Sequence, residues 1–276
     1  MRRIAVFFFT LLAVSVLSGQ DQGVKNIGPS GLRYTHFLRT ELIINRFLTP
    51  NGYHFVDVEP GSFGRYLQTL PLKPPGSEIL TCDGEMAFTN AYTAAVIDMN
   101  MTTTCKAGAA AVVMRLRSEY LYRQKRYDKI AFHFDNGFLC DFGHYAEGCR
   151  YLNGHWVMTA IRDYGYPNFI RYMNFVFANT CIKSLKKDLK KVGNTDDVKA
   201  GDVFIRDTNP AHCFIVMHVI ENKQRKRQFL LAQGFTPAQD IQMLRYDDGP
   251  WFNLDTHSNM LYGELINRDY LHRFED

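Results

Sequence analysis

The stretch from Ala200 to Ile241 constrains the fold most, because its apolar runs are short and separated by turn residues. The pattern predicts three β-strands in a meander, at Asp202–Ile205, His212–Ile220 and Gln228–Gln233. A loop that contains Pro210 separates the first two strands, and the polar turn ENKQRKR separates the last two. We therefore expect an antiparallel sheet built around the second strand.

Side chains on that second strand should alternate between the two faces of the sheet. Alternation places five residues on one face (His212, Phe214, Val216, His218 and Ile220) and four on the other (Cys213, Ile215, Met217 and Val219). His212 opens the strand directly after a loop. A side chain in that position can reach a cleft while its backbone stays fixed.

The N-terminus has the order of a secretory signal peptide over residues 1–19. Arg2 and Arg3 precede the apolar run IAVFFFTLLAVSVL, and Ser18 and Gly19 follow it. The run is shorter than the roughly 20 residues that span a bilayer, and Gln20 stands where a lipoprotein would carry Cys. We predict an exported protein, periplasmic or extracellular, with no lipid anchor and no membrane span in the mature chain.

Composition indicates a globular protein and argues against nucleic-acid binding. The chain is 46% hydrophobic and 22% charged, and loss of Arg2 and Arg3 would lower its formal charge from +4 to about +2. The sequence has no C-x-x-C pair and no His at zinc-finger spacing, so we predict neither a metal nor a cofactor. Disulfides, burial and a nucleophilic role remain open for the six cysteines, Cys82, Cys105, Cys140, Cys149, Cys181 and Cys213.

Two long helices are predicted in the middle of the chain. The first runs from Ala107 to about Tyr122 behind the threonines 102–104, which could cap it. Arg115 and Glu119 are an i, i+4 pair on this helix, so together with Arg117 they either lie on its surface or line a cleft. The second helix starts at Tyr166-Pro167-Asn168 and runs to about Thr180.

Short strands flank the turn Asp135-Asn136-Gly137, which is typical of a β-hairpin. Strands are expected at Lys129–Phe134 and Phe138–Phe142, followed by further β-like segments up to Ile161. Strands and helices are thus mixed along the chain. The sequence predicts the α+β class.

The segment from the second long helix to the meander resembles the NlpC-type papain-like cell-wall peptidases. The resemblance is carried by GDVFI at Gly201–Ile205 and by a following strand that opens with His. It implies a base at His212 and a residue that orients its ring at Gln233. The chemistry requires a thiolate stabilised by a helix N-terminus, with an imidazole beside it.

The nucleophile expected from this resemblance is missing. Its position falls in the sequence YGYPN at Tyr164–Asn168, which contains no Cys, Ser or Thr. Cys181 lies roughly 20 Å further along a continuous helix, and Cys213 points to the opposite face from His212.

Two hypotheses follow. The cleft is degenerate and binds without cleaving, or Cys105, at the start of the other long helix, is the nucleophile, with His212 as base and Gln233 or Asp240 as orienter. Cys105 could equally be a disulfide partner or a buried thiol.

From Arg46 to about Trp251 the chain also resembles an exported bacterial domain-of-unknown-function family, number 4846, found mainly in Bacteroidetes. Six motifs carry this resemblance in order: FLTPNGY, SFGRYLQTLPLKP, MRLRSEYLY, FDNGF, GDVFI and LLAQGFTPAQDIQ. The resemblance implies a Cys and an Asp in the first turns of the Arg115 helix, where this chain has Ala109 and Ala111.

Together these patterns predict a leader at 20–45, one family domain at 46–252 and a tail at 253–276. Within the domain, an N-terminal α+β portion (46–160) should pack on a papain-like antiparallel sheet with helices (161–245). We expect either a cysteine hydrolase or a binding scaffold for peptide or peptidoglycan-like material. Candidate ligand-binding residues are Arg115, Arg117, Glu119 and Trp251.

Overall fold

A computed structural model describes residues 41–101, 105, 107–194, 196–246, 249–255 and 259–275 of the chain. The predicted signal peptide, most of the predicted leader and the threonines 102–104 lie outside these ranges. Within them the fold is α+β, as predicted. None of the helices described has the length and apolar character needed to cross a membrane.

The part of the chain up to residue 158 has short helices and short strands around one long helix, α3. Its elements are α1 (Ile43–Arg46), β1 (Tyr53–Phe55), α2 (Phe63–Gln68), η2 (Phe88–Tyr92), β2 (Thr93–Val96), α3 (Ala109–Arg123), η3 (Tyr127–Lys129), β3 (Ala131–His133), β4 (Leu139–Asp141), α4 (Phe142–Ala146), β5 (Cys149–Leu152) and β6 (His155–Met158). The second half begins with helices and continues mostly in strands. Its elements are α5 (Tyr166–Asn179), α6 (Ile182–Lys187), β7 (Lys190–Lys191), β8 (Val203–Arg206), β9 (His212–Asn222), β10 (Arg227–Gln233), β11 (Gln242–Leu244), η4 (Gly263–Leu265), η5 (Arg268–Tyr270) and β12 (Leu271–Arg273).

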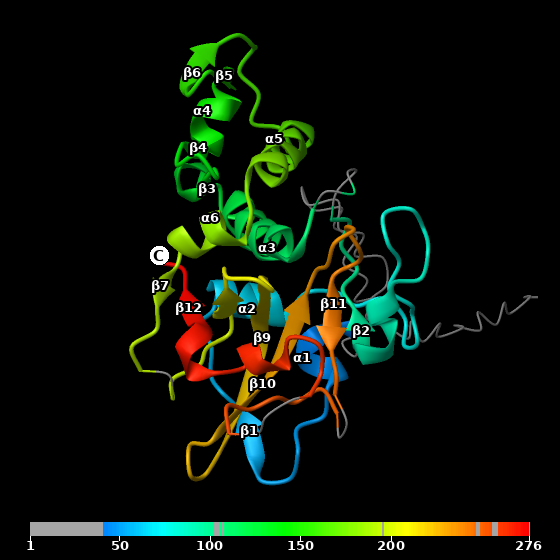
Figure 1. The fold of residues 1–276 in the computed structure, drawn as a ribbon. Helices are drawn as coiled ribbons and strands as arrows, with labels where there is room; N and C mark the ends of the chain where they lie inside the picture. Colours follow the sequence, from blue (N-terminus) through cyan, green and yellow to red (C-terminus); the bar gives the residue numbers. More distant parts are fainter. Residues whose placement is uncertain are drawn as a thin grey trace, which may run out of the picture.

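An eight-stranded antiparallel sheet forms the lower part of the molecule (Figure 1). Its strand order is β2-β11-β10-β9-β8-β12-β7, and β1 pairs separately with β9. The predicted meander is present as β8, β9 and β10, which are neighbours in the sheet. Strands from residues 53–55, 93–96 and 271–273 join the same sheet, so it extends across the boundary predicted near residue 160 and into the tail.

The two faces of the sheet carry separate hydrophobic cores. Cys213, Ile215 and Met217 pack in the core that includes α3, whereas Phe214 and Val216 pack in a second core with C-terminal residues that include Met260, Leu265 and Ile266. The predicted alternation is therefore right for the first half of β9.

Alternation fails at His218 because β9 contains a β-bulge. The register opposite β10 shifts between Leu230, which faces His218, and Leu231, which faces Val216, so Met217 is an extra residue. After the bulge Val219 joins the second core, and His218 bonds to Gln68 of α2 on the first face. The prediction that His212 and His218 share a face was wrong.

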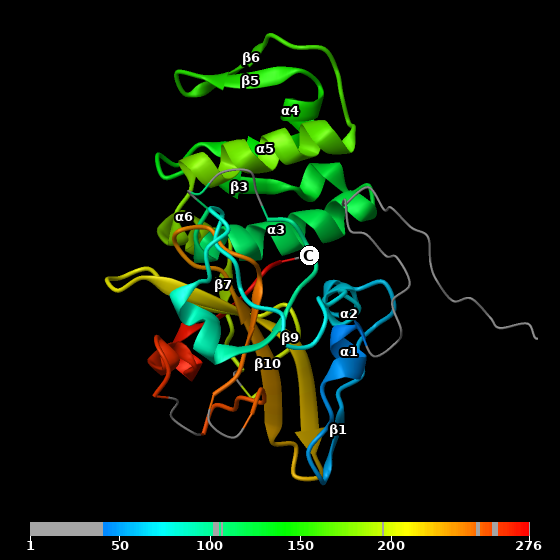
Figure 2. The ribbon, with the colours of Figure 1, turned by 90° about the vertical axis from the view of Figure 1, so that its right-hand side faces the viewer.

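α3 lies between the sheet and an upper lobe made of β3 to β6, α4 and α5, with α6 beside it (Figures 1 and 2). Its start approaches the end of β10 very closely: a Cβ on Gly234 would lie 2.4 Å from Cγ2 of Val112 and 3.3 Å from the carbonyl oxygen of Gly108. Only glycine fits there. The N-terminus of α3 is thus fixed against the residue that follows Gln233.

The upper lobe has an aromatic interior. Phe142 contacts Tyr122, Tyr164 and Phe169, and Phe138 packs edge-on to Trp156 of the β5–β6 hairpin. The predicted Asp135-Asn136-Gly137 turn joins β3 and β4, with Gly137 at φ 88°.

Candidate functional site

His212 and Gln233 are hydrogen-bonded, with Nε2 of the imidazole 2.8 Å from Oε1 of the amide. His212 is the first residue of β9 and Gln233 the last of β10, so the antiparallel pairing brings them together at the same end of these two central strands. His212 is 3% exposed. The structure therefore places the two predicted residues together.

A chain of buried amides continues from this pair. Nε2 of Gln233 donates to Oε1 of Gln242 (2.8 Å), which faces it across β10 and β11. Nε2 of Gln242 donates to the carbonyl oxygen of Thr89 (2.7 Å) and to Oγ1 of Thr93 (2.8 Å). Every amide group of Gln233 and Gln242 is satisfied, which is what makes their burial tolerable.

Gln239, in the loop between β10 and β11, bonds to two members of this network. Its Nε2 also donates to Gln242 (3.3 Å), and its Oε1 accepts from the hydroxyl of Thr89 (3.2 Å). We call the group His212, Gln233, Gln239 and Gln242 with Thr89 and Thr93 the glutamine network.

Burial lowers the pKa of His212 to about 4 and outweighs the hydrogen bond to Oε1 of Gln233, which by itself would raise the pKa. Arg206 lowers this pKa further and Glu264 raises it. Their side chains form an ion pair of 2.8 Å at the rim of the site. The imidazole is neutral at pH 7.

Aromatic rings enclose His212 on the outer side. Tyr262 stacks on the imidazole at 4.3 Å with 12° between the planes, and Phe235 lies 5.5 Å away. Phe88 packs edge-on against Phe235 at 4.8 Å and is 65% exposed. The site thus consists of a polar interior and an aromatic cover over the imidazole.

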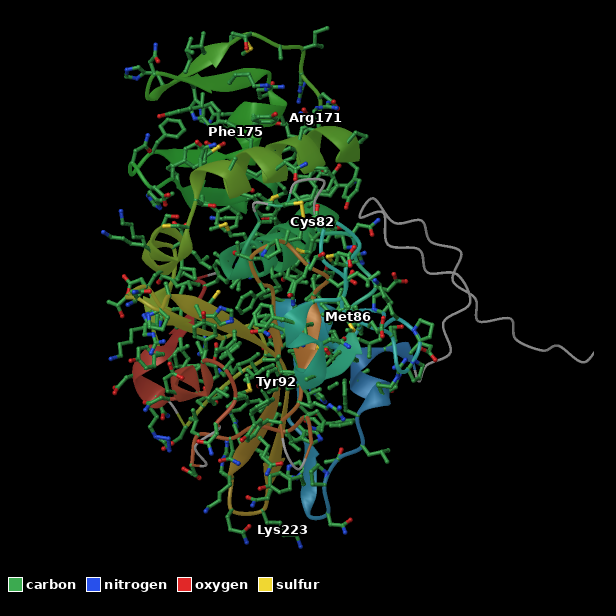
Figure 3. The ribbon with its side chains drawn as sticks, turned by 45° about the vertical axis from the view of Figure 1, so that its right-hand side comes forward. Cys82, Met86, Tyr92, Arg171, Phe175 and Lys223 are labelled. Carbon is green, nitrogen blue, oxygen red and sulfur yellow. A yellow bond between two sulfur atoms is a disulfide. The ribbon has the colours of Figure 1, made fainter. Side chains whose placement is uncertain are left out.

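Cys105 is bonded to Cys82 in a disulfide, on the side of the molecule where Figure 3 labels Cys82 and Met86. The N–H of Cys82 donates to the carbonyl of Ala238 (2.7 Å), and the N–H of Ala238 donates to that of Cys105 (3.1 Å). A disulfide sulfur cannot act as a thiolate nucleophile. This corrects the hydrolase assignment of Cys105, which also precedes Gly108, the N-cap residue of α3.

The other four cysteines do not replace it. Cys140 and Cys213 are buried, and burial raises the pKa of both thiols. Cys213 faces the α3 side of the sheet, away from Phe214 and the second core. Cys181 is exposed at the start of α6, and Cys149 lies in the β5–β6 hairpin.

Asp240 does not orient His212. Its carboxylate pairs with Lys73 (2.8 Å) and accepts from the N–H of Leu80 (3.1 Å). Its sequence neighbour Gln239 enters the glutamine network instead.

The predicted ligand-binding residues have separate locations. Arg115 and Glu119 are both fully buried and paired with each other, and Tyr166 of α5 bonds to both, so they pack the helix and do not line a cleft. Arg117 lies over the rings of Phe63 and Phe274 and borders a cavity of about 480 Å³.

Trp251 lies near the other buried histidine. It donates to the carbonyl of Leu48, and its ring lies 5.8 Å from His218.

Among the described residues, Cys82, Asp83 and Cys105 place three potential metal-ligand atoms within 4.8 Å of one another. Their two sulfurs are bonded to each other, which leaves them unsuited to metal binding in this state.

Sequence reasoning missed Gln239, Gln242 and Tyr262. A polar amide at Gln242, directly before apolar Met243 and Leu244, is the pattern that could have indicated a buried network. No such pattern marks Tyr262.

Comparison with known proteins gives one match. A family model described as domain of unknown function (4846) covers residues 43–266. No curated protein and no solved structure matches the chain. The chain therefore belongs to the domain of unknown function family 4846.

Proposed function

We propose that this chain is a ligand-binding module of the bacterial cell envelope, exported by its signal peptide. It holds a peptide or peptidoglycan-like ligand on the surface around His212 and does not cleave it. Its sheet would then be a papain-like, NlpC-type scaffold whose catalytic centre has become a binding site.

The observation that carries this proposal is the state of Cys105. A cysteine hydrolase needs a thiolate beside its imidazole, but the sulfur of Cys105 is held by Cys82. In addition, a base with a pKa near 4 drives proton transfer poorly at neutral pH. A well-oriented imidazole without a nucleophile retains only its ability to hydrogen-bond a ligand.

The outer surface suits a peptide. Leu80, Met86 and Phe88 are apolar side chains that are 40–65% exposed. Phe88 contacts Phe235, which in turn contacts His212. Met86 lies at the surface in Figure 3. Apolar side chains beside a few fixed polar groups are typical of ligand sites.

Binding to purified peptidoglycan sacculi, and to the soluble peptides released from them, tests this proposal. The double variant Phe88→Ala/Phe235→Ala should bind at least tenfold more weakly than the wild type. Leu152→Ala is the matched control, because Leu152 is comparably exposed at 55% but lies on the β5–β6 hairpin. Equal binding by all three proteins would disprove a site at His212.

Turnover is measured in the same samples by chromatography of the released peptides. The wild type and His212→Ala should both release nothing. Product release by the wild type that disappears in His212→Ala would establish a hydrolase instead.

A further inference from the structure

We propose that Gln242 is a positioning residue that locks His212 in the tautomer protonated at Nε2. As a consequence, Nδ1 is a fixed hydrogen-bond acceptor, and the ligand presents a peptide N–H donor to it. The ligand part of this inference rests on the proposed function, whereas the tautomer part does not.

The assignment starts at the backbone carbonyl of Thr89, which can only accept a hydrogen bond. The Gln242 side-chain atom 2.7 Å from this oxygen must therefore be the amide nitrogen. The orientation of the Gln242 amide follows from the backbone alone. Its oxygen, Oε1, is consequently the atom that faces β10.

The orientation of Gln233 follows in the same way. Oε1 of Gln242 lies 2.8 Å from one side-chain terminus of Gln233 and can only accept, so Gln233 must turn its NH₂ group toward it. Nε2 of Gln239 donates to the same oxygen and supports this direction. Gln233 then presents Oε1 to His212.

The last step fixes the proton on the imidazole. Oε1 of Gln233 can only accept, so Nε2 of His212, 2.8 Å away, must carry the hydrogen. A neutral imidazole has one N–H, and Nδ1 is therefore the bare nitrogen. No described residue forms a hydrogen bond with Nδ1.

Reversing this arrangement is unfavourable because the whole relay is buried. Gln242 is 0% exposed and Gln233 5% exposed. If the Gln233 amide rotated by 180°, its oxygen would face the oxygen of Gln242, whichever nitrogen of His212 carried the proton. That mismatch leaves buried polar groups unsatisfied, so the structure holds one tautomer.

A fixed acceptor selects the chemistry of the ligand. A carbonyl or carboxylate placed against Nδ1 would meet a lone pair and be repelled, whereas a peptide N–H or a hydroxyl would donate to it. The Arg206 guanidinium nearby already donates to Glu264 and to the carbonyl of Pro210. The site therefore recognises a donor group that lies beside an apolar side chain.

Long-range ¹H–¹⁵N NMR on the uniformly labelled mature chain tests the tautomer without any ligand. In the wild type at pH 7, His212 should show a protonated Nε2 and a bare Nδ1. A His212 protonated at Nδ1 or at both nitrogens would overturn the assignment. This measurement needs no variant, so misfolding cannot obscure it.

Gln242→Leu tests the positioning role. Without the Gln242 oxygen, the Gln233 amide is free to rotate, and His212 should become a mixture of both tautomers. Gln68→Leu is the control, because Gln68 bonds to His218 and not to His212. A single Nε2–H tautomer in a folded Gln242→Leu protein would show that Gln242 does not set it.

Synthetic tetrapeptides methylated at one amide nitrogen at a time test the ligand part. Methylation at one position should weaken binding to the wild type at least fivefold, and should have less effect on binding to His212→Phe, which lacks the acceptor. Uniform binding of all methylated peptides would overturn the donor assignment alone. Failure of every peptide to bind, methylated or not, would overturn it together with the proposed function, while the tautomer result stands separately.

Discussion

The regions around His212 and His218 differ although the two histidines are six residues apart on one strand. Both are fully or almost fully buried, and burial lowers the pKa of each to about 4. His212 is linked to the glutamine network. His218 bonds only to Gln68 among the described residues, and its Nε2 and Oε1 of Gln68 have no partner.

The difference shows that burial alone does not make a histidine part of a site. Phe55 and Trp251 surround the His218 ring, which fills space between β1, α2 and the chain after β11. His212 has its proton assigned by three successive hydrogen bonds and lies beside the half-buried aromatic side chains of Phe235 and Tyr262. The candidate site is therefore distinguished by the fixed position of the proton on His212. A lowered pKa does not distinguish it, because His218 has one too.

The largest expected effect is a loss of stability at low pH, because both histidines have a lowered pKa in the folded state. In the unfolded chain a histidine has a pKa near 6.5, so as the pH falls the unfolded state binds protons before the folded state does. Each histidine should therefore remove roughly 2–3 kcal/mol of stability at pH 4.5, which makes about 5 kcal/mol for the two together, and none above about pH 7. Urea unfolding at both pH values, for the wild type, His212→Gln and His218→Gln, measures this loss.

Each single variant should lose less stability on acidification than the wild type, and by similar amounts. The raised pKa values of Asp188 and Asp202 act in the opposite direction in all three proteins, so they cancel in the comparison. A variant that loses as much stability as the wild type would show that its histidine is not held neutral in the folded state.

A second effect should separate the two regions. The Cys82–Cys105 disulfide closes a 23-residue separation and lies next to Ala238, beside Gln239 of the network. Replacing both cysteines with Ala should lower the free energy of unfolding by about 3 kcal/mol. It should shift the NMR signals of the His212 ring while those of His218 stay in place.

Cys181→Ala is the control for this experiment, because Cys181 is exposed and unpaired with another cysteine. It should leave the histidine signals in place and cost no more than the loss of a helix cap, about 1 kcal/mol, because Cys181 is the N-cap residue of α6. Equal shifts of the NMR signals of both histidines in the double variant would mean that the disulfide supports the whole sheet and not only the part around His212.

The smallest expected effect compares the two glutamines. Gln242→Leu leaves the Thr89 carbonyl and the Gln233 amide unsatisfied in the interior and should cost about 2 kcal/mol. Gln68→Leu loses one hydrogen bond to His218, but it removes at the same time a buried amide oxygen that has no partner. Its cost should therefore stay below about 1 kcal/mol. Thermal and urea unfolding at pH 7 measure both values, and a larger cost for Gln68→Leu would reverse the interpretation of the two regions.

Local sequence patterns predicted the elements that depend on local chemistry. The meander follows from short apolar runs between turns, and the β3–β4 hairpin from Asp135-Asn136-Gly137. The prediction that His212 and Gln233 would lie together came from the resemblance to a peptidase family and not from a local pattern. The glutamine network was not predicted, because it joins η2, β2, β10 and β11, which are far apart in the sequence.

Two further predictions failed for reasons of tertiary structure. Arg115 and Glu119 have the spacing of a surface ion pair, but α5 covers their helix and buries them. The faces of β9 followed alternation only up to Met217, where the bulge inserts one residue. The burial of the ion pair and the bulge in β9 both depend on the neighbouring elements, α5 and β10, and cannot be inferred from the sequence of α3 or β9 alone.

The position of β12 has a consequence for the order of folding. β12 lies between β8 and β7, so these strands can be joined only after residues 271–273 have been synthesised, and Tyr262, which covers His212, comes from the same late part of the chain. Such long-range pairing is intrinsically slow. Until residues 271–273 are made, β8 therefore presents an unpaired edge, and unpaired strand edges are the places where one chain pairs with another.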